Sequence, residues 1–151
     1  ETAVAPNLSV RENLELMCGV HGFTKEKMHA KTKELSEQFD LTAILSKRAD
    51  KLSGGWQRRL SIAMALISEP QILFLDEPFA GLFPEVIHTV KTILLEEKER
   101  GTAIILIEHD MAIIKELCDY VYVLDGGKNI AEGKAVDVLN DQAVKIAYLG
   151  D

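Results

Sequence analysis

Apolar residues in this chain form two short continuous runs and several patterns at helical spacing. The continuous runs cover residues 72–75 and 103–107, and polar residues follow each of them. A run of this kind is typical of a strand buried on both faces, as in a parallel sheet covered by helices. Between the runs, Pro84 begins a helical pattern that Gly101 ends. This strand–helix–strand order predicts an α/β fold with a mostly parallel sheet flanked by helices.

The first third of the chain shows helical patterns only. A capping box at residues 9–12 begins one helix, Thr24 caps a second, and a short helix follows at residues 41–45. Lysines on the second helix predict a solvated face. We therefore expect residues 1–51 to form an all-helical subdomain and residues 52–151 to form the sheet-containing core.

The last third of the chain alternates short helices with a hairpin. Asp110 is placed to cap a helix over residues 111–117. Residues 120–131 predict a β-hairpin, because a glycine pair separates two β-rich segments. Two short helices are expected after it, around residues 136–139 and 143–149.

Composition narrows the function classes. The chain has 151 residues, 47% of them hydrophobic, which is ordinary for one globular domain. A net charge of −7 argues against nucleic-acid binding, which relies on clustered Lys and Arg. No apolar run is long enough to span a bilayer, so a membrane role would act through a partner. Cys18 and Cys118 lie in apolar helical patterns and are interpreted as buried free thiols in a reducing compartment.

Two adjacent carboxylates, Asp76 and Glu77, follow the first buried strand directly. The C-terminal edge of an open α/β sheet is where such folds bind their ligands. If strand geometry continues through both residues, their side chains point to opposite sides. One carboxylate could then hold a metal, directly or through water, while the other handles a nucleophilic water. The alternative is a solvated acidic turn without chemistry.

Two further polar positions lie at the ends of expected elements. Ser53, Gly54 and Gly55 precede a helical pattern, and a serine hydroxyl, free N–H groups and the helix dipole together make an anion site. A simple Ser-Gly helix cap is the alternative there. His109 follows the second buried strand, which predicts a place on the same edge as the two acids. A structural hydrogen bond is the alternative for this histidine.

Together these residues resemble the ATP-binding subunit of an ABC transporter, a P-loop NTPase. Residues 52–59 resemble the family's signature motif, residues 72–76 its Walker B strand, and residues 79–83 its D-loop. Glu77 matches the catalytic glutamate and His109 the switch histidine. The motifs occur in the family's order and spacing, and the likeness covers essentially the whole chain.

The resemblance implies ATP and Mg²⁺ as cofactors. Asp76 would help to hold Mg²⁺ through water, Glu77 would orient or deprotonate the attacking water, and His109 would donate to the γ-phosphate. The tip at residues 53–55 would clamp ATP that is held by an opposing subunit. The implied partners are a second ATP-binding subunit and a transmembrane permease that touches residues 1–51. The implied location is the cytoplasmic face of the cell membrane.

The sequence also departs from the family pattern. It contains no G-x-x-x-x-G-K-[ST] phosphate loop, which in the family lies upstream of these motifs, as does a glutamine loop. The chain therefore resembles the C-terminal part of the domain, without about the first 80 residues. We expect it to bind ATP weakly alone, not to hydrolyse it, and to self-associate through uncovered apolar sheet surface. Trp56 replaces the usual Gln, and Phe83 replaces the usual Asp of the D-loop and is interpreted as an apolar plug.

Two other functions fit the same residues. One is an inert or regulatory fragment that only binds partner chains, and the other is a soluble ABC-type ATPase without a transport role. Within transporters, residues 13–22 and the Gly-Gly-Trp signature at residues 54–56 resemble drug or ABC-2-type exporters. Residues 107–111 and 148–150 instead resemble branched-chain amino-acid or lipopolysaccharide-export subunits. The cargo is not encoded here, because it does not enter this subunit.

Overall fold

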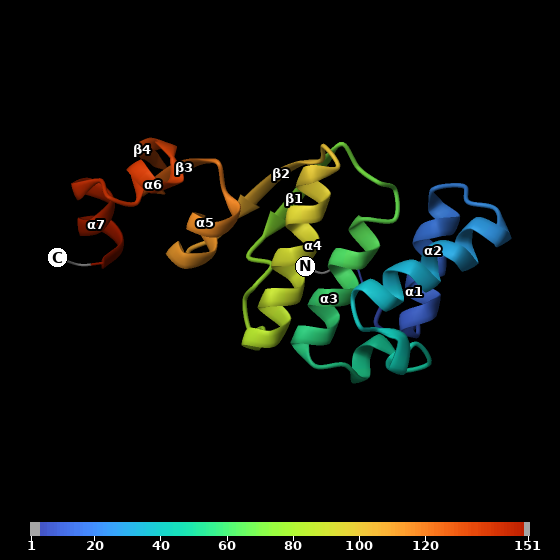
Figure 1. The fold of residues 1–151 in the computed structure, drawn as a ribbon. Helices are drawn as coiled ribbons and strands as arrows, with labels where there is room; N and C mark the ends of the chain where they lie inside the picture. The colour runs from blue at the N-terminus through green and yellow to red at the C-terminus, as the bar shows by residue number, and fades with distance from the viewer. Residues whose placement is uncertain (1–3, 150–151) are drawn as a thin grey trace. The chain divides into compact units, whose positions relative to one another are not determined.

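A computed structural model describes residues 4–149 (Figure 1). Gly150, part of one resemblance noted above, lies outside the described residues. The chain divides into two compact units, the first up to Ile105 and the second from Leu106 onward. Each unit is described by itself below.

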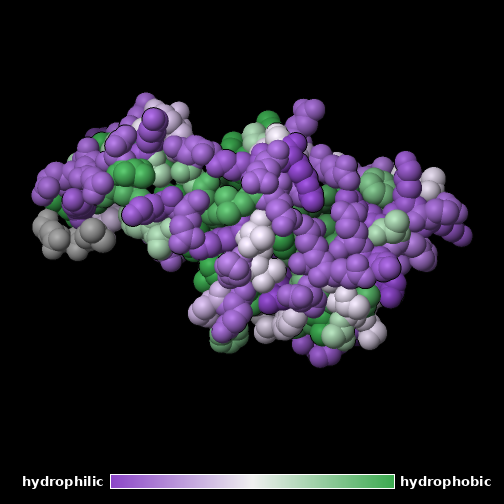
Figure 2. Space-filling view, in the orientation of Figure 1, coloured by the Kyte–Doolittle hydropathy of each residue, from purple (hydrophilic) through white to green (hydrophobic). Residues whose placement is uncertain are grey.

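The first unit begins with the predicted helical segment. Helix α1 (Val10–Val20) starts at the capping box, where the Glu12 amide donates to Ser9 Oγ at 3.2 Å and the Ser9 amide donates to Glu12 Oε2 at 2.7 Å. Helix α2 (Lys25–Gln38) is capped by Thr24, and two short 3₁₀ turns follow, η1 (Thr42–Ile44) and η2 (Ala49–Lys51). The buried apolar residues of this segment include Leu14, Cys18, Leu35, Phe39 and Leu41. Figure 2 shows hydrophilic residues over most of the visible face of α1 and α2.

Helices and strands alternate in the rest of the first unit, as the sequence predicts. Helix α3 (Gly54–Ala65), strand β1 (Ile72–Asp76), helix α4 (Pro84–Glu99) and strand β2 (Ala103–Ile107) follow one another. The strands β1 and β2 are neighbours in a parallel sheet, and α4 is the crossover between them. Gly101, with φ +98°, ends α4 as expected.

Strand β1 corrects one prediction about burial. Leu73 and Leu75 are 3% and 8% exposed, but the alternate residues Ile72 and Phe74 are 55% and 71% exposed. The prediction that this strand is buried on both faces is therefore wrong for the described chain. An apolar run reports the hydrophobicity of both faces, whereas the elements described here cover only one of them.

The second unit is a small hairpin with helices. Helix α5 (Met111–Leu117) is capped by the Asp110 carboxylate, as predicted. The antiparallel strands β3 (Tyr120–Asp125) and β4 (Lys128–Lys134) join at Gly126 and Gly127, both with positive φ. Helices α6 (Ala135–Val138) and α7 (Gln142–Leu149) complete the unit. Its core consists of Val123, Val138 and Val144.

Two observations on the described residues bear on the composition arguments. No helix among them is both long and apolar enough to cross a membrane. Both cysteines are free; Cys18 is buried, as predicted, whereas Cys118 is only half-buried. The prediction that both thiols are buried is therefore wrong for Cys118.

Candidate functional site

The first turn of α3 forms an exposed helix tip. Ser53 occupies the N-cap position, but its hydroxyl makes no capping hydrogen bond. Ser53 and Gly54 are exposed. The Ser53 hydroxyl and the first amides of the helix are thus not used by the protein's own core, which an anion site at this tip requires.

The paired acids lie where β1 ends. Asp76 is the last residue of the strand, and Glu77 adopts a left-handed backbone conformation with φ +44°. Strand geometry therefore stops at Asp76, and the strand alternation that would separate the two side chains does not extend to Glu77. Both residues are exposed, and the Ala80 amide donates to the Glu77 carbonyl at 3.1 Å, which closes a turn directly after the acids.

The structure brings the helix tip and this acidic turn together. Arg58, in the second turn of α3, donates from Nη1 to the Asp76 carbonyl at 3.4 Å. A Cβ atom added at Gly55 would lie 3.4 Å from Leu82 Cδ2 and 4.0 Å from the Gly81 carbonyl. The glycine thus allows the loop after β1 to approach the helix closely.

A cavity of about 280 Å³ lies beside this contact. It is lined by the helix tip, the first turns of α3 and the start of α4: Ser53, Gly55, Trp56, Arg59, Phe83, Glu85 and Val86. The two departures from the family pattern, Trp56 and Phe83, therefore lie at the same place in the fold.

Arg59 is a site residue that the sequence argument missed. It is only 8% exposed and donates from Nη1 to the Phe39 carbonyl at 3.3 Å and to Asp40 Oδ2 at 3.2 Å. Its guanidinium carbon lies 4.4 Å from the ring centroid of Trp56, in cation–π geometry. The available signal was the spacing of Trp56 and Arg59, three residues apart on one helix. These contacts tie the first two turns of α3 to the end of α2.

His109 belongs to the second compact unit. It follows β2 by two residues, as predicted, and its ring Nδ1 lies 3.8 Å from Glu108 Oε2. The Glu108 carboxylate also accepts from the His109 amide at 3.0 Å. The histidine side chain is 70% exposed. The structure thus groups His109 with Glu108 and the start of α5, and its role at a nucleotide stays a prediction.

A magnesium ion at Asp76 would need further ligands from outside the protein, such as phosphate oxygens and water. Within residues 4–149, no group of three or more His, Cys, Asp or Glu side chains could hold a metal. Mg²⁺ commonly binds through one or two carboxylates together with phosphate oxygens and water. A single exposed carboxylate at the end of β1 fits that mode of binding.

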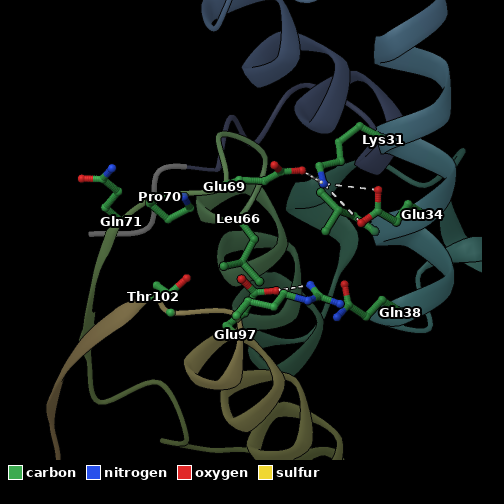
Figure 3. Close-up of a pocket in the computed structure, with 12 residues that line it drawn as sticks. Lys31, Glu34, Gln38, Leu66, Glu69, Pro70, Gln71, Glu97 and Thr102 are labelled. Atoms are coloured by element: carbon green, nitrogen blue, oxygen red, sulfur yellow. Dashed lines mark hydrogen bonds and ion pairs between the residues drawn. The ribbon is translucent and has the colours of Figure 1, made fainter.

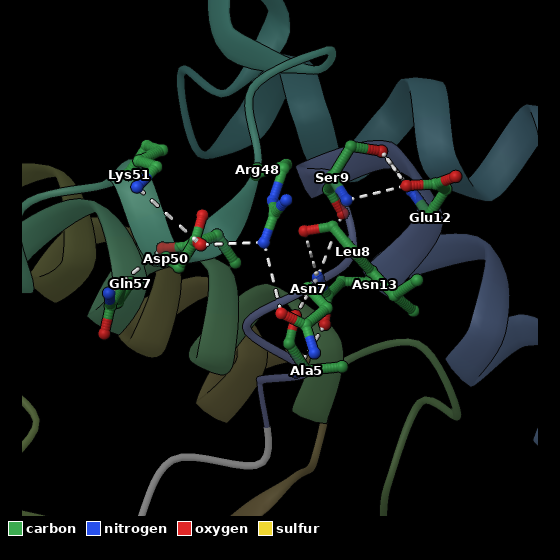
Figure 4. Close-up of polar contacts among 11 residues, drawn as sticks. Ala5, Asn7, Leu8, Ser9, Glu12, Asn13, Arg48, Asp50, Lys51 and Gln57 are labelled. Carbon is green, nitrogen blue, oxygen red and sulfur yellow. Dashed lines mark hydrogen bonds and ion pairs between the residues drawn. The ribbon is translucent and has the colours of Figure 1, made fainter.

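A polar network fixes the loop that leads into α1 (Figure 4). Asn13 is fully buried; its side-chain amide donates to the carbonyls of Ala5, Leu8 and Ser9 and accepts from the Ala5 amide at 2.8 Å. Arg48 donates to Asn7 Oδ1 at 3.1 Å. The loop is therefore held in one conformation against the end of the helical segment.

A larger cavity of about 460 Å³ lies near the opposite ends of α3 and β1 (Figure 3). Lys31 Nζ, at one side of it, donates to Glu69 Oε1 at 2.8 Å and to Glu34 Oε1 at 3.2 Å. Burial works to lower the pKa of Lys31, but the hydrogen bonds and the negative charges of Glu69 and Glu34 together outweigh burial and raise that pKa. None of the predicted site residues lines this cavity, whose charged groups pair with one another.

The first unit is thus an α/β fold in which a helix tip lies beside the paired acids at the end of a strand. The family model for ABC transporters matches residues 1–80. That match covers more than half of the chain, so the chain belongs to the ABC transporter family.

Two relatives illustrate the likeness. The chain is 34% identical to the lipopolysaccharide export system ATP-binding protein LptB of Haemophilus influenzae, over 100% of the chain and 63% of LptB. It is 40% identical to the Nod factor export ATP-binding protein I of Rhizobium etli, over 90% of the chain and 43% of that protein. The chain thus spans less than two thirds of the length of either relative.

Solved structures agree with the family. One ATP-binding subunit of an ABC transporter matches with a TM-score of 0.82 at 28% identity, over 99% of the chain and 62% of that subunit. An ATP-binding cassette in its ADP conformation matches with a TM-score of 0.78 at 28% identity, over 97% of the chain and 64% of the cassette. These likenesses confirm the predicted fold class.

Proposed function

We propose that this chain is part of the ATP-hydrolysing subunit of an ABC transporter and works with a second ATP-binding subunit and a permease. The observation that carries the proposal is the exposed tip at residues 53–55, which packs against the loop after the paired acids. A helix tip offers donors to phosphate, and the acids offer oxygens to a metal and to water.

The chemistry assigned to each residue follows from phosphoryl transfer. ATP with Mg²⁺ supplies the phosphoryl group and the metal charge. Catalysis is then mainly positioning and electrostatic stabilisation of the charge that develops on the phosphate oxygens. The tip at residues 53–55 holds the phosphate of ATP that is bound to the opposing subunit. Asp76 holds the metal through water, and Glu77 orients or deprotonates the attacking water. His109 donates to the γ-phosphate.

A phosphate loop of the form G-x-x-x-x-G-K-[ST] does not occur in the 151 residues. In other nucleotide-binding proteins this loop cradles the phosphates with its backbone amides. The proposal therefore predicts that the chain alone binds MgATP weakly and does not turn it over. Calorimetric titration and a steady-state ATPase assay on the purified chain measure both.

The decisive experiment supplies the loop. A chimera keeps the part of LptB of Haemophilus influenzae that this chain does not match and replaces the matched part with this chain. We expect the chimera to hydrolyse ATP, and the Glu77→Gln variant to lose turnover by at least a hundredfold while it still binds ATP. Glu99→Gln, an exposed acid on α4, is the matched control. Turnover that survives Glu77→Gln would contradict the assigned role.

A permease partner is proposed for the helical segment at residues 1–51, and with it a location on the cytoplasmic face of the membrane. The loop held by Asn13 and Arg48 presents a fixed surface at the start of this segment, as a docking site requires. Co-purification of the chimera with the LptB permease partner tests this. Loss of co-purification on Asn13→Ala, with the ATPase intact, is the expected result.

A further inference from the structure

The larger cavity of the first unit, about 460 Å³, is lined by three separate segments of the chain. Helix α2 forms one wall, the connection between α3 and β1 forms a second, and the end of α4 with the segment that leads into β2 forms the third. Leu35 and Leu66 contribute buried apolar surface, whereas acids, bases, amides and a hydroxyl supply much of the remaining lining. A concave surface that combines apolar walls with a few polar groups is the usual form of a small-molecule site.

Glu97, on the last turn of α4, leaves one carboxylate oxygen open. The residue is only 7% exposed, and its Oε1 atom accepts from Arg100 Nη1. Its Oε2 atom accepts no hydrogen bond from the part of the chain that the structure describes. Among the side chains of that part that are not exposed, only the Thr32 hydroxyl oxygen is both sealed from solvent and unpaired, so Glu97 Oε2 reaches the open space of the cavity. A largely buried carboxylate oxygen without a donor favours the binding of a cation.

Glu69, between α3 and β1, supplies a second open oxygen to the same cavity. Its Oε1 atom accepts from Lys31 Nζ at 2.8 Å, and its Oε2 atom bonds to no group of residues 4–149. Figure 3 shows the side chain of Leu66 between those of Glu69 and Glu97, so the two open oxygens lie on either side of an apolar side chain. With Glu34, the lining carries three acids against two bases, which leaves one negative charge without a partner of opposite charge.

We propose that this cavity binds a linear aliphatic diamine, with one ammonium group at Glu97, the other at Glu69, and the methylene groups along Leu66. An ammonium group is a compact charge with three N–H donors, so a single open oxygen is enough to hold it. A guanidinium would need both oxygens of one carboxylate, and the Oε1 atom of each acid already has a partner. A bare metal ion is disfavoured, because no cluster of three or more His, Cys, Asp or Glu side chains within the described chain could hold one. The inference goes beyond the proposed function, since none of the residues assigned to ATP lines this cavity.

Calorimetric titration of the purified chain with putrescine, without nucleotide and at physiological salt, tests the proposal. We expect saturable binding at one site, and at least about tenfold weaker binding of butylamine, which has the same carbon chain but one ammonium group. Mg²⁺ carries the same charge as putrescine and should not displace it at equal concentration, which separates this site from general attraction to a chain of net charge −7. In amide NMR spectra, putrescine should shift the signals of Leu66, Gly101 and Thr102 and leave those of residues 53–55 unchanged.

Three variants locate the charges that hold the ligand. Glu97→Gln keeps the shape of the side chain and removes its charge, and should weaken the binding of putrescine by about tenfold or more. Glu69→Gln should weaken it less, because the Glu69 side chain is 79% exposed to water. Glu99→Gln is the matched control, since Glu99 is an exposed acid on the same helix and does not line the cavity.

Circular dichroism shows whether each variant is folded, and the comparison of putrescine with butylamine on the parent chain needs no variant at all. Absence of saturable binding, equal affinity for putrescine and butylamine, amide shifts confined to other residues, or an affinity unchanged in folded Glu97→Gln would each overturn the inference. These measurements use no ATP, so their failure is distinct from failure of the chimera experiment.

Discussion

Two adjacent arginines on α3 do different work. Arg58 is half-buried and donates to the Asp76 carbonyl, whereas Arg59 is buried beneath Trp56 and pairs with Asp40. The first contact aligns the helix with the acidic turn, and the second aligns it with the end of α2. A substitution at Arg58 thus tests the contact of α3 with the acidic turn, and a substitution at Arg59 tests its contact with the end of α2.

We predict that replacing Arg59 lowers the free energy of unfolding, and that the loss is larger for alanine than for lysine. Arg59→Ala leaves the Phe39 carbonyl and Asp40 without this donor, and should lower the free energy of unfolding by about 1–3 kcal/mol. Arg59→Lys keeps the charge but loses the planar guanidinium that stacks on Trp56. Its free energy of unfolding should therefore lie between those of the parent chain and of Arg59→Ala. Urea unfolding followed by Trp56 emission measures both. Equal stability of all three proteins would contradict the assigned contacts.

The two cysteines should react at different rates. Cys18 is fully buried, and burial raises its pKa above the ordinary thiol value, so little thiolate is present near neutrality. Cys118 is half-buried. Labelling with a disulfide reagent should therefore show one faster and one slower thiol, and Cys118→Ser should remove the faster phase. Cys18→Ser serves as the converse variant.

At the scale of elements, β1 offers a paired test of one-sided burial. Leu73→Ala should destabilise the chain by about 2–5 kcal/mol, because it leaves a cavity under a buried side chain. Phe74→Ala, on the exposed face of the same strand, should change the free energy of unfolding by about 0.5 kcal/mol or less. Chemical denaturation of both variants distinguishes the two faces. A large loss for Phe74→Ala would mean that its face is covered in solution.

Local signals predicted most elements correctly. The capping box at Ser9, the Thr24 and Asp110 caps and the proline at the start of α4 act through neighbours in sequence, so the chain reveals them directly. The exposed face of β1 was not predictable, because burial depends on which distant elements cover a strand. The contact of Arg59 with the end of α2 escaped for the same reason, and so did the cavity that Trp56 and Arg59 line together with Phe83, because both join segments far apart in sequence.

Among the motif residues, the sequence placed Ser53 at a helix tip and Asp76 at a strand end, and the structure confirms both positions. It did not reveal that the Ser53 hydroxyl leaves the helix uncapped, nor that the backbone turns at Glu77. The side-chain rotamer of Ser53 and the backbone conformation at Glu77 decide these two features, and the residue types alone allow several alternatives for each. The chemical roles of these residues stay predictions.

At the scale of the whole molecule, acid should destabilise the chain. Hydrogen bonds from Ser9 and Lys31 lower the pKa values of Glu12 and Glu69, respectively, below the ordinary value of 4.5. Each carboxylate thus contributes stability that is present above that value and is lost as pH falls through its folded pKa. Lys31 behaves oppositely: its raised pKa contributes stability below the ordinary value of 10.5, which is lost as pH rises above it.

Glu69→Gln should therefore flatten the fall in stability between about pH 5 and pH 3. Glu99→Gln, an exposed change of the same chemistry, is the control. Thermal unfolding across that pH range measures the effect. An identical acid profile for Glu69→Gln and the parent chain would show that the Lys31 pair does not hold in solution.

The left-handed backbone conformation at Glu77 lowers the stability of the fold at the residue that is proposed to act in catalysis. A non-glycine residue in this conformation costs about 1–2 kcal/mol, which asparagine tolerates better. We expect Glu77→Asn to raise the melting temperature of the chain and, in the chimera, to abolish turnover. The residue assigned to water activation would then be one whose replacement raises thermal stability. Selection of this chain for thermal stability alone would therefore tend to replace Glu77 and lose turnover.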